Sequence, residues 1–430
     1  MYRRTLLSYL TVGSGLLVLP DAVKASNLEG KDMQERIMLP DEQERGSELF
    51  WQRVKEHYSL KPGLVMLNAA NLCPSAKVTT ERLFELTLDL DGDPSFENRE
   101  KYEAHRELTR MSLSKFLKVD NDEIALVRNT TEANRTVIDG LELGKGDEVV
   151  LWDQNHESNS LSWDVWSRRY GFVVKRVSTP VTPASEEDLL APFIEALTPR
   201  TRVLSFSHVS NLSGIKLPAE KLCRMARERG ALSLVDGAQS FGMMPLDLHS
   251  MGCDFFTGSA HKWLCGPRET GVLYVRREQV DGLWPSMVTH LWEKHEKAGA
   301  RKFDNLGQQD DGRIAALAEA IQFQQEIGAS RIEQRIRQLV ARLIEGLDEA
   351  LPSVRFVTPR PAVLNAGIVI IATTNDEPKA EKIMGRLYKD FNIAATAADV
   401  GGRTLVRFSP HIYNSLDDID HAIEAMKAII

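Results

Sequence analysis

The chain has 430 residues, of which 43% are hydrophobic and 27% are charged, and its formal net charge is -8. This length is too great for one small domain and favours one large domain with a smaller one. The composition is that of an ordinary globular protein, and the negative charge does not indicate a nucleic-acid partner. The four cysteines are scattered without a CxxC pair, which indicates neither a disulfide framework nor a zinc site.

The N-terminus predicts an export signal that is absent from the mature protein. Arg3 and Arg4 precede an apolar run over residues 6–19, and small residues follow up to a cleavage position after Ala25. The arginine pair resembles a signal for the twin-arginine translocase, which carries folded proteins. We therefore expect cofactor loading before export, and a periplasmic location. A Sec signal and a membrane anchor are the alternatives, although the run is short for an anchor.

From about residue 120, apolar strand candidates alternate with amphipathic segments of helical length. Near-continuous apolar strands separated by helices predict an α/β fold, with a mainly parallel sheet covered by helices on both faces. The expected strands are 123–128, 148–152, 172–177, 202–206, 231–235, 254–257 and 271–275.

After about residue 310 the alternation of strands and helices gives way to long helical runs and then short strands, so a smaller α+β domain is expected. Its expected helices and strands are the helices 313–327, 330–351 and 416–430 and the strands 367–371 and 404–408. The expected division of the chain is a signal peptide over 1–25, an N-terminal arm and linker over 26–65, a large domain over 66–310 and a small C-terminal domain over 311–430.

An acid and a lysine carry the chemistry that the sequence predicts. Asp236 ends one apolar strand, and Lys262 lies just after another short apolar run. Pyridoxal 5'-phosphate (PLP) needs a lysine for a Schiff base, and an acid that keeps its pyridine nitrogen protonated so that the ring acts as an electron sink. Alone, Lys262 is compatible with a surface lysine and Asp236 with a helix cap. Together, at strand ends where ligands bind in α/β sheets, they predict a PLP site.

A candidate phosphate site lies where an earlier strand gives way to a helix. Thr130 and Thr131 stand at this point, and free backbone N–H groups at a helix start suit a phosphate. The alternative is a capping box, because Thr-Thr-Glu also caps helices well.

These segments resemble the class V aminotransferase family of fold-type I PLP enzymes, which includes cysteine desulfurases, kynureninases and isopenicillin N epimerase-like proteins. The residues that carry the resemblance are Asp236-Gly-Ala-Gln239 and Ser259-Ala-His261-Lys262. The resemblance covers nearly all of the expected mature chain. It implies that Lys262 forms the Schiff base, Asp236 pairs with the pyridinium nitrogen, and Gln239 donates to the phenolic oxygen of the ring. It also implies that Ser259 and His261 help to hold the phosphate.

The same resemblance implies roles for residues elsewhere in the chain. Thr130 and Thr131 match the phosphate-binding turn of the family, and His156 matches the residue that stacks on the ring. Arg407 corresponds to the arginine that grips the substrate carboxylate, a task that suits the bidentate guanidinium.

Three further residues match less closely. Asn68 and Asn71 lie where the family brings an N-terminal loop over the substrate. Gln308 lies in a segment that crosses from a partner subunit to the phosphate, although the family usually has threonine there. The resemblance therefore implies a homodimer with shared sites.

The absence of a cysteine argues against one reaction of this family, sulfur transfer. Cysteine desulfurases need a nucleophilic cysteine shortly before the carboxylate arginine, and residues 392–402 contain none. The export signal, the cofactor motifs and the segment 261–267 resemble the periplasmic PLP enzymes that tailor the siderophore pyoverdine. That resemblance implies oxidative decarboxylation of a chromophore-attached glutamate to succinamide. The alternatives are a periplasmic aminotransferase or epimerase acting on an amino acid, and a non-catalytic PLP-fold binding protein.

Overall fold

The computed structural model describes residues 47–290, 292–373 and 378–430. Residues 39–430 belong to one compact unit, and the fold below is that of its described part. The predicted signal peptide and the first part of the predicted arm lie outside the described residues. Within the described ranges, no helix combines the length and the apolar character needed to cross a bilayer.

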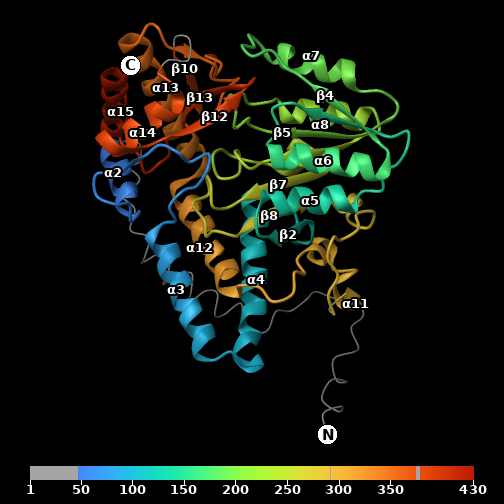
Figure 1. Cartoon of the computed structure of the whole chain (residues 1–430). Coiled ribbons are helices and arrows are strands. Elements are labelled where there is room, and N and C mark those ends of the chain that lie inside the picture. The colour runs from blue at the N-terminus through green and yellow to red at the C-terminus, as the bar shows by residue number, and fades with distance from the viewer. Residues whose placement is uncertain (1–46, 291, 374–377) are drawn as a thin grey trace. The chain divides into compact units, whose positions relative to one another are not determined.

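A seven-stranded sheet forms the centre of the fold, in the order β2-β8-β7-β6-β5-β3-β4 (Figure 1). β8 runs opposite to the other six strands, which all point the same way, so the prediction of a mainly parallel sheet is confirmed. The strands are β2 (Ile124–Val127), β3 (Glu148–Trp152), β4 (Val173–Val177), β5 (Thr201–Ser207), β6 (Leu232–Asp236), β7 (Phe255–Ser259) and β8 (Gly271–Val275).

The strand directions explain where a site can form. Because β2 and β7 each pair antiparallel with β8, β2 points the same way as β7. β3, β5 and β6 are parallel to β7 through successive pairings. The residues that follow all five strands therefore meet at one edge of the sheet, where α/β proteins bind ligands.

Helices bury the sheet on its faces. Val149 and Leu151 of β3 and Leu234 of β6 pack with Val137 of α5 and Trp163 of α6 in one apolar layer. Helices α7 and α8 contact β4, β5 and β6. All residues of β3, β7 and β8 are buried, as in a sheet covered on both faces. The helices of this part are α5 (Thr130–Gly140), α6 (Glu157–Tyr170), α7 (Glu186–Ala196), α8 (Ala219–Glu228), α9 (Leu248–Met251), α10 (Arg277–Val280), α11 (Trp292–His295) and the 3-10 turns η1 (Asn121–Glu123) and η2 (Gly299–Phe303).

The C-terminal part contains an antiparallel sheet in the order β12-β13-β10-β9, with α13, α14 and α15 beside it (Figure 1). The expected strands 367–371 and 404–408 correspond to β10 and β13, and the three expected helices correspond to α12, α13 and α15. The elements are α12 (Asp311–Ile327), α13 (Ala329–Ala350), β9 (Arg355–Phe356), β10 (Val369–Ala372), α14 (Ala380–Phe391), β11 (Ile393–Ala394), β12 (Thr396–Val400), β13 (Arg403–Phe408) and α15 (Leu416–Ile429).

The described part of the region before the large sheet contains three α-helices and a short strand. Its elements are α2 (Glu48–Glu56), β1 (Val65–Met66), α3 (Lys77–Gly92) and α4 (Phe96–Leu117). Glu48 of α2 accepts two hydrogen bonds, of 2.7 and 2.8 Å, from the buried Arg335 of α13. Lys55 pairs with Asp418 of α15 at 2.8 Å. The later part of the predicted arm and linker is thus a helix docked on the C-terminal helices.

Helix α12 packs along both α3 and α4, and Figure 1 shows it between them. The first helix after residue 310 therefore contacts elements that the sequence assigned to the large domain. The predicted domain boundary at that residue stays a prediction.

Candidate active site

Four of the predicted residues lie at or just after the ends of strands that finish at one edge of the large sheet. Asp236 is the last residue of β6, and Ser259 is the last residue of β7. Thr130 opens α5 just after β2, and Lys262 follows β7 by three residues. The shared direction of these strands brings together side chains that are more than 100 residues apart in sequence.

The Lys262 amine has an environment that suits a nucleophile. The pKa of Lys262 is lowered to about 8, mainly because the amine is buried. The nearby Asp236 carboxylate raises this pKa, and the Arg407 cation lowers it. A substantial fraction of the amine is therefore neutral in mildly alkaline solution, and only a neutral amine can attack an aldehyde.

The Asp236 carboxylate is held at both oxygens. Its Oδ1 accepts a 3.0 Å hydrogen bond from the backbone N–H of Ala238, and its Oδ2 accepts one of 2.8 Å from Nδ2 of Asn134. The Thr257 hydroxyl donates to Asn134 Oδ1 at 2.9 Å, which fixes the amide. The sequence analysis missed Asn134 as a site residue. Its position one helical turn after Thr130, on the same face of α5, was the available signal.

The predicted phosphate residues meet across the sheet edge. The Thr130 backbone N–H donates to Ser259 Oγ at 2.8 Å, and the two hydroxyl oxygens also lie 2.8 Å apart. The helix cap is Asn129, whose Oδ1 accepts from the Glu132 backbone N–H at 3.0 Å. The threonines are therefore not the cap that the alternative interpretation requires. Thr131 lies beside them, with its hydroxyl 3.4 Å from that of Ser158.

Two histidines lie near Lys262. Burial lowers the pKa of His156, and the Lys262 cation lowers it further while Asp236 opposes the shift. His156 caps α6, and its Nδ1 accepts a 3.2 Å hydrogen bond from the Ser158 backbone N–H. Burial and Lys262 lower the pKa of His261 to about 4. Both rings are thus neutral near pH 7, and a neutral imidazole suits the predicted stacking role of His156.

Gln239 is anchored on both sides of its amide. Its Oε1 accepts from the indole N–H of Trp263 at 2.8 Å, and its Nε2 donates to the backbone oxygen of Ala70 at 3.0 Å. One amide hydrogen remains for another acceptor. The predicted bond to the ring oxygen is compatible with this arrangement and stays a prediction.

Arg407 is a buried cation, only 7% exposed. Its Nη1 donates to the backbone oxygen of Asn211 at 3.1 Å and its Nη2 to Asn68 Oδ1 at 3.4 Å. Its Nε has no hydrogen-bond partner within the described ranges, and no ion pair with a described carboxylate forms. Burial lowers the pKa of Arg407 to about 10. A buried guanidinium with spare donors is well suited to bind an external carboxylate.

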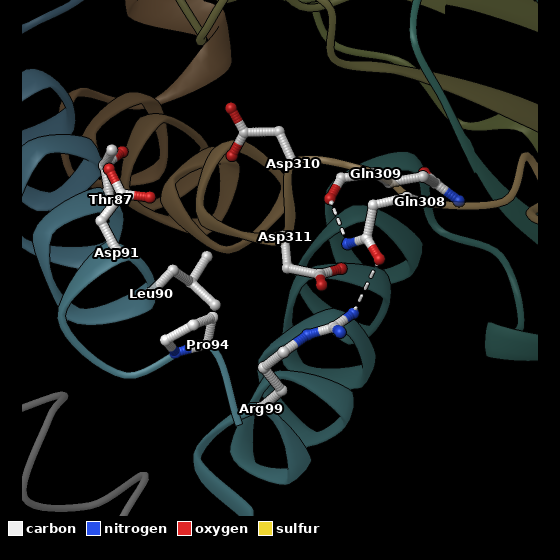
Figure 2. A pocket seen from close by; sticks show the side chains of 9 residues that line it. All are labelled: Thr87, Leu90, Asp91, Pro94, Arg99, Gln308, Gln309, Asp310 and Asp311. Atoms are coloured by element: carbon white, nitrogen blue, oxygen red, sulfur yellow. Dashed lines mark hydrogen bonds between the residues drawn. The ribbon is translucent and has the colours of Figure 1, made fainter. Parts of the chain in front are cut away.

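Two predicted residues lie apart from these contacts. Asn71 is exposed, and its backbone N–H closes a turn to the Asn68 carbonyl at 3.0 Å. Gln308 is exposed in a pocket between α3, α4 and the start of α12 (Figure 2). Its Oε1 accepts from Arg99 at 3.2 Å, and its Nε2 donates to the Gln309 carbonyl at 3.4 Å. The predicted contact of Gln308 with a partner subunit's phosphate stays a prediction.

The residues present fit PLP. The site offers a buried amine of lowered pKa at Lys262, a fixed carboxylate at Asp236, and a helix N-terminus with clustered hydroxyls at Thr130 and Ser259. These are the groups needed to bind an aldehyde, a pyridinium nitrogen and a phosphate.

Comparison with known proteins agrees with this geometry. The family model "Aminotransferase class-V" matches residues 93–421. Isopenicillin N epimerase from Amycolatopsis lactamdurans is 30% identical over 394 residues, which cover 88% of this chain and 98% of that protein. The Streptomyces clavuligerus isopenicillin N epimerase is 29% identical, with the same coverage of both chains. A probable cysteine desulfurase from Pyrococcus abyssi is also 29% identical, over 77% of this chain and 84% of its own length.

Solved structures share the fold. The apo structure of a cysteine desulfurase from Thermococcus onnurineus NA1 superposes with a TM-score of 0.79 and 24% identity, covering 88% of this chain and 97% of the other. The fold is thus that of the fold-type I PLP enzymes. The family match gives PLP as the cofactor. The chain belongs to the class V aminotransferase family of PLP-dependent enzymes.

Proposed function

We propose that this protein is a periplasmic PLP enzyme of pyoverdine maturation, which converts the chromophore-attached glutamate to succinamide. In the net reaction, the amino acid group and one dioxygen give the amide, one carbon dioxide and one water. The amino-acid part of the proposal is carried by the buried Arg407, which has no carboxylate partner among the described residues. The pyoverdine part rests on the export-type N-terminus and on the resemblance over residues 261–267.

The chain's own residues supply binding, orientation and proton transfer. Arg407 binds the substrate α-carboxylate through its fork, and Asn68 and the Asn211 carbonyl hold that fork in place. When bound, PLP supplies an electron sink for the electron pair left on the α-carbon. Lys262 Nζ, with a pKa near 8, can accept or return a proton at that carbon.

Sulfur transfer is a poor fit, although probable cysteine desulfurases are among the relatives. Residues 392–402 contain no cysteine, and this segment forms β11, β12 and the turn after them. All four cysteines of the chain are buried: Cys73, Cys223, Cys253 and Cys265. A desulfurase cysteine would have to lie on the segment shortly before Arg407, and none of these four lies there.

Epimerisation is the second candidate, and two observations favour it. The isopenicillin N epimerases match this chain over almost their full length. An arginine that binds the substrate carboxylate stabilises that group and so disfavours its loss as carbon dioxide. Such an arginine suits reactions that keep the carboxylate and move only the α-proton. Exchange of the α-hydrogen for deuterium without loss of carbon dioxide would distinguish this reaction from decarboxylation.

We further propose that the protein forms a homodimer. Phe84 and Leu88 of α3 are 68% and 63% exposed, and Phe96 of α4 is 85% exposed. Exposed large apolar side chains on two successive helices favour a surface that another chain covers. The pocket that contains Gln308 is lined by the same two helices (Figure 2). A Leu88→Glu variant should shift the mass measured by light scattering from dimer towards monomer.

The test of the pyoverdine proposal is gene deletion in the producing cell, with mass analysis of the secreted siderophore. Deletion should leave glutamate in place of succinamide. The wild type and the surface variant Lys221→Ala should restore succinamide, whereas Lys262→Ala should not. An unchanged side-chain mass after deletion would remove the pyoverdine proposal and leave the PLP assignment standing.

A further inference from the structure

Two cysteines that are far apart in sequence lie together beside the Lys262 turn. The Sγ atoms of Cys73 and Cys265 and a ring nitrogen of His411 lie within 4.8 Å of one another. Cys73 is 6% exposed, Cys265 is 2% exposed and His411 is fully buried. The Tyr413 hydroxyl lies 3.5 Å from Cys73 Sγ. The cluster is therefore a dense group of reactive side chains that the proposed function does not use.

Backbone contacts hold the two cysteines close. The Cys73 N–H donates to the His261 carbonyl at 2.9 Å, and the Ser75 hydroxyl donates to the Gly266 carbonyl at 3.1 Å. The Cys265 N–H closes a turn to the Lys262 carbonyl at 2.9 Å. The segment that follows Asn68 thus runs alongside the turn that carries Lys262. A disulfide would bring the two sulfurs from within 4.8 Å of each other to roughly 2.05 Å.

Packing alone does not favour a cysteine at position 265. Its φ is +58°, in the left-handed region that strains a residue with a Cβ atom. Burial acts to raise the pKa of Cys265, yet contacts with Cys73 and His411 lower it overall, whereas the pKa of Cys73 is raised. Cys265 is thus the thiol of the pair that ionises more readily, and the thiolate is the form that reacts in thiol oxidation.

His411 is not free to bind a metal ion. Its Nε2 lies 2.7 Å from the Trp263 carbonyl oxygen, an acceptor, so that nitrogen carries the hydrogen. Its Nδ1 accepts the N–H of Ile412 at 2.7 Å. Both ring nitrogens are therefore used, and the Nε2–H also points towards Cys265 Sγ at 3.6 Å. A dithiol explains the cluster better than a metal site does.

We propose that Cys73 and Cys265 form a redox-active pair that closes to a disulfide under peroxide. The Cys265 thiolate attacks one peroxide oxygen and becomes a sulfenic acid as hydroxide leaves. The Cys73 sulfur then attacks that sulfur, and water leaves. Two thiols and one hydrogen peroxide give one disulfide and two waters, and the sulfurs together lose two electrons. The bond links the loop of Asn68 to the turn of Lys262. This inference does not depend on the proposed substrate.

The test is peptide mapping of the full chain after treatment with hydrogen peroxide. Free thiols are alkylated, and the protein is digested with trypsin without reductant. The peptide 263–268 should appear joined to the peptide 56–77, in which Lys61 precedes proline and is not cut. The joined species should disappear when dithiothreitol is added. Separate alkylation of both cysteines, or sulfinic acid at Cys265 without the link, would overturn the proposal.

The chain offers a matched control in its other two cysteines. Cys223 and Cys253 are also buried, but burial raises the pKa of both thiols. The double variant Cys223→Ser/Cys253→Ser should still form the link at the wild-type rate. Cys73→Ser should lose the link and leave a sulfenic acid at Cys265 that dimedone captures. A stoichiometric zinc ion that protects both thiols until a chelator removes it would also contradict the proposal.

Discussion

Asn134 and Asp236 are joined by a 2.8 Å hydrogen bond from the amide Nδ2 to the carboxylate Oδ2. The two residues are 2% and 3% exposed. Thr257 lies opposite Asp236 in the pairing of β6 with β7, and its hydroxyl fixes the other end of the Asn134 amide. The acid that PLP needs is therefore oriented by one helix and one neighbouring strand. This is the positioning that a catalytic carboxylate requires.

The first prediction concerns this hydrogen bond. Asn134→Ala leaves Asp236 Oδ2 and the Thr257 hydroxyl without their partner, which costs about 1–3 kcal/mol. We expect PLP affinity, measured by titration of the cofactor-free protein, to fall about tenfold or more. The control is Thr136→Ala, on the same helix, whose hydroxyl donates to the Glu132 carbonyl at 3.0 Å. Equal affinities in both variants and the wild type would contradict a positioning role for Asn134.

The second prediction is a pH dependence of cofactor capture. The attacking form of Lys262 is the neutral amine, and its pKa is about 8. The rate at which cofactor-free protein gains the visible absorption of bound PLP should therefore rise with pH and level off above about 8. Because the Arg407 cation lowers this pKa, Arg407→Gln should move the midpoint to higher pH. A midpoint that stays in place would show that the two groups are not coupled.

The third prediction tests substrate binding by Arg407. Arg407→Lys keeps a positive charge but loses the fork that matches a carboxylate. We expect kcat/KM for the amino-acid substrate to fall about 30-fold, as for the loss of about 2 kcal/mol from a hydrogen bond to a charged group. PLP binding should change little. Arg403→Lys, an exposed position on the same strand, is the control. Similar losses in both variants would argue against a specific carboxylate contact.

The fourth prediction concerns the docking of α2. Burial acts to raise the pKa of Glu48, but hydrogen bonding and the charge of Arg335 lower it below 4.5 overall. A lowered pKa means that this contribution to stability is present above pH 4.5 and is lost as pH falls through the folded-state value. Glu48→Gln removes the charge that pairs with Arg335, which is fully buried.

We expect this variant to lower the free energy of unfolding at pH 7 by about 1–2 kcal/mol in urea melts, because Glu48 itself is partly exposed. The difference from the wild type should shrink as the pH falls below 4.5 and through the lowered pKa of Glu48. Glu56→Gln, in an exposed pair with Arg53, should have little effect at either pH. A constant difference across this pH range would assign the loss to packing instead of charge.

Much of the site was predictable because strand direction is readable from sequence. Apolar runs ending at Asp236 and just before Lys262 place both side chains at one edge of a parallel sheet. The Thr130 contact with Ser259 agrees with the phosphate roles that the family resemblance implied for both residues. Asn134 was missed because its role depends on which face of α5 turns towards Asp236. A single polar residue within a helix does not reveal that orientation.

The N-terminal helices were not predicted, for a different reason. Helix α4 buries Thr109, Arg110 and Ser114 beside Tyr102, Leu113 and Leu117, so polar residues interrupt the apolar pattern of its buried face. Arg110 is neutralised by Asp304, at 2.5 Å, nearly 200 residues later in the chain. The docking of α2 likewise depends on Arg335. Pairings between such distant charged residues cannot be read from one sequence.

The most direct test of the central claim is to locate the lysine that carries the cofactor. Purified protein is reduced with borohydride, which makes the lysine–PLP bond permanent, and is digested with trypsin. The account predicts PLP on the peptide 230–268, uncut at Lys262, and no covalently bound PLP in Lys262→Ala. PLP on another lysine, or a wild-type protein that retains none after incubation with the cofactor, would contradict it.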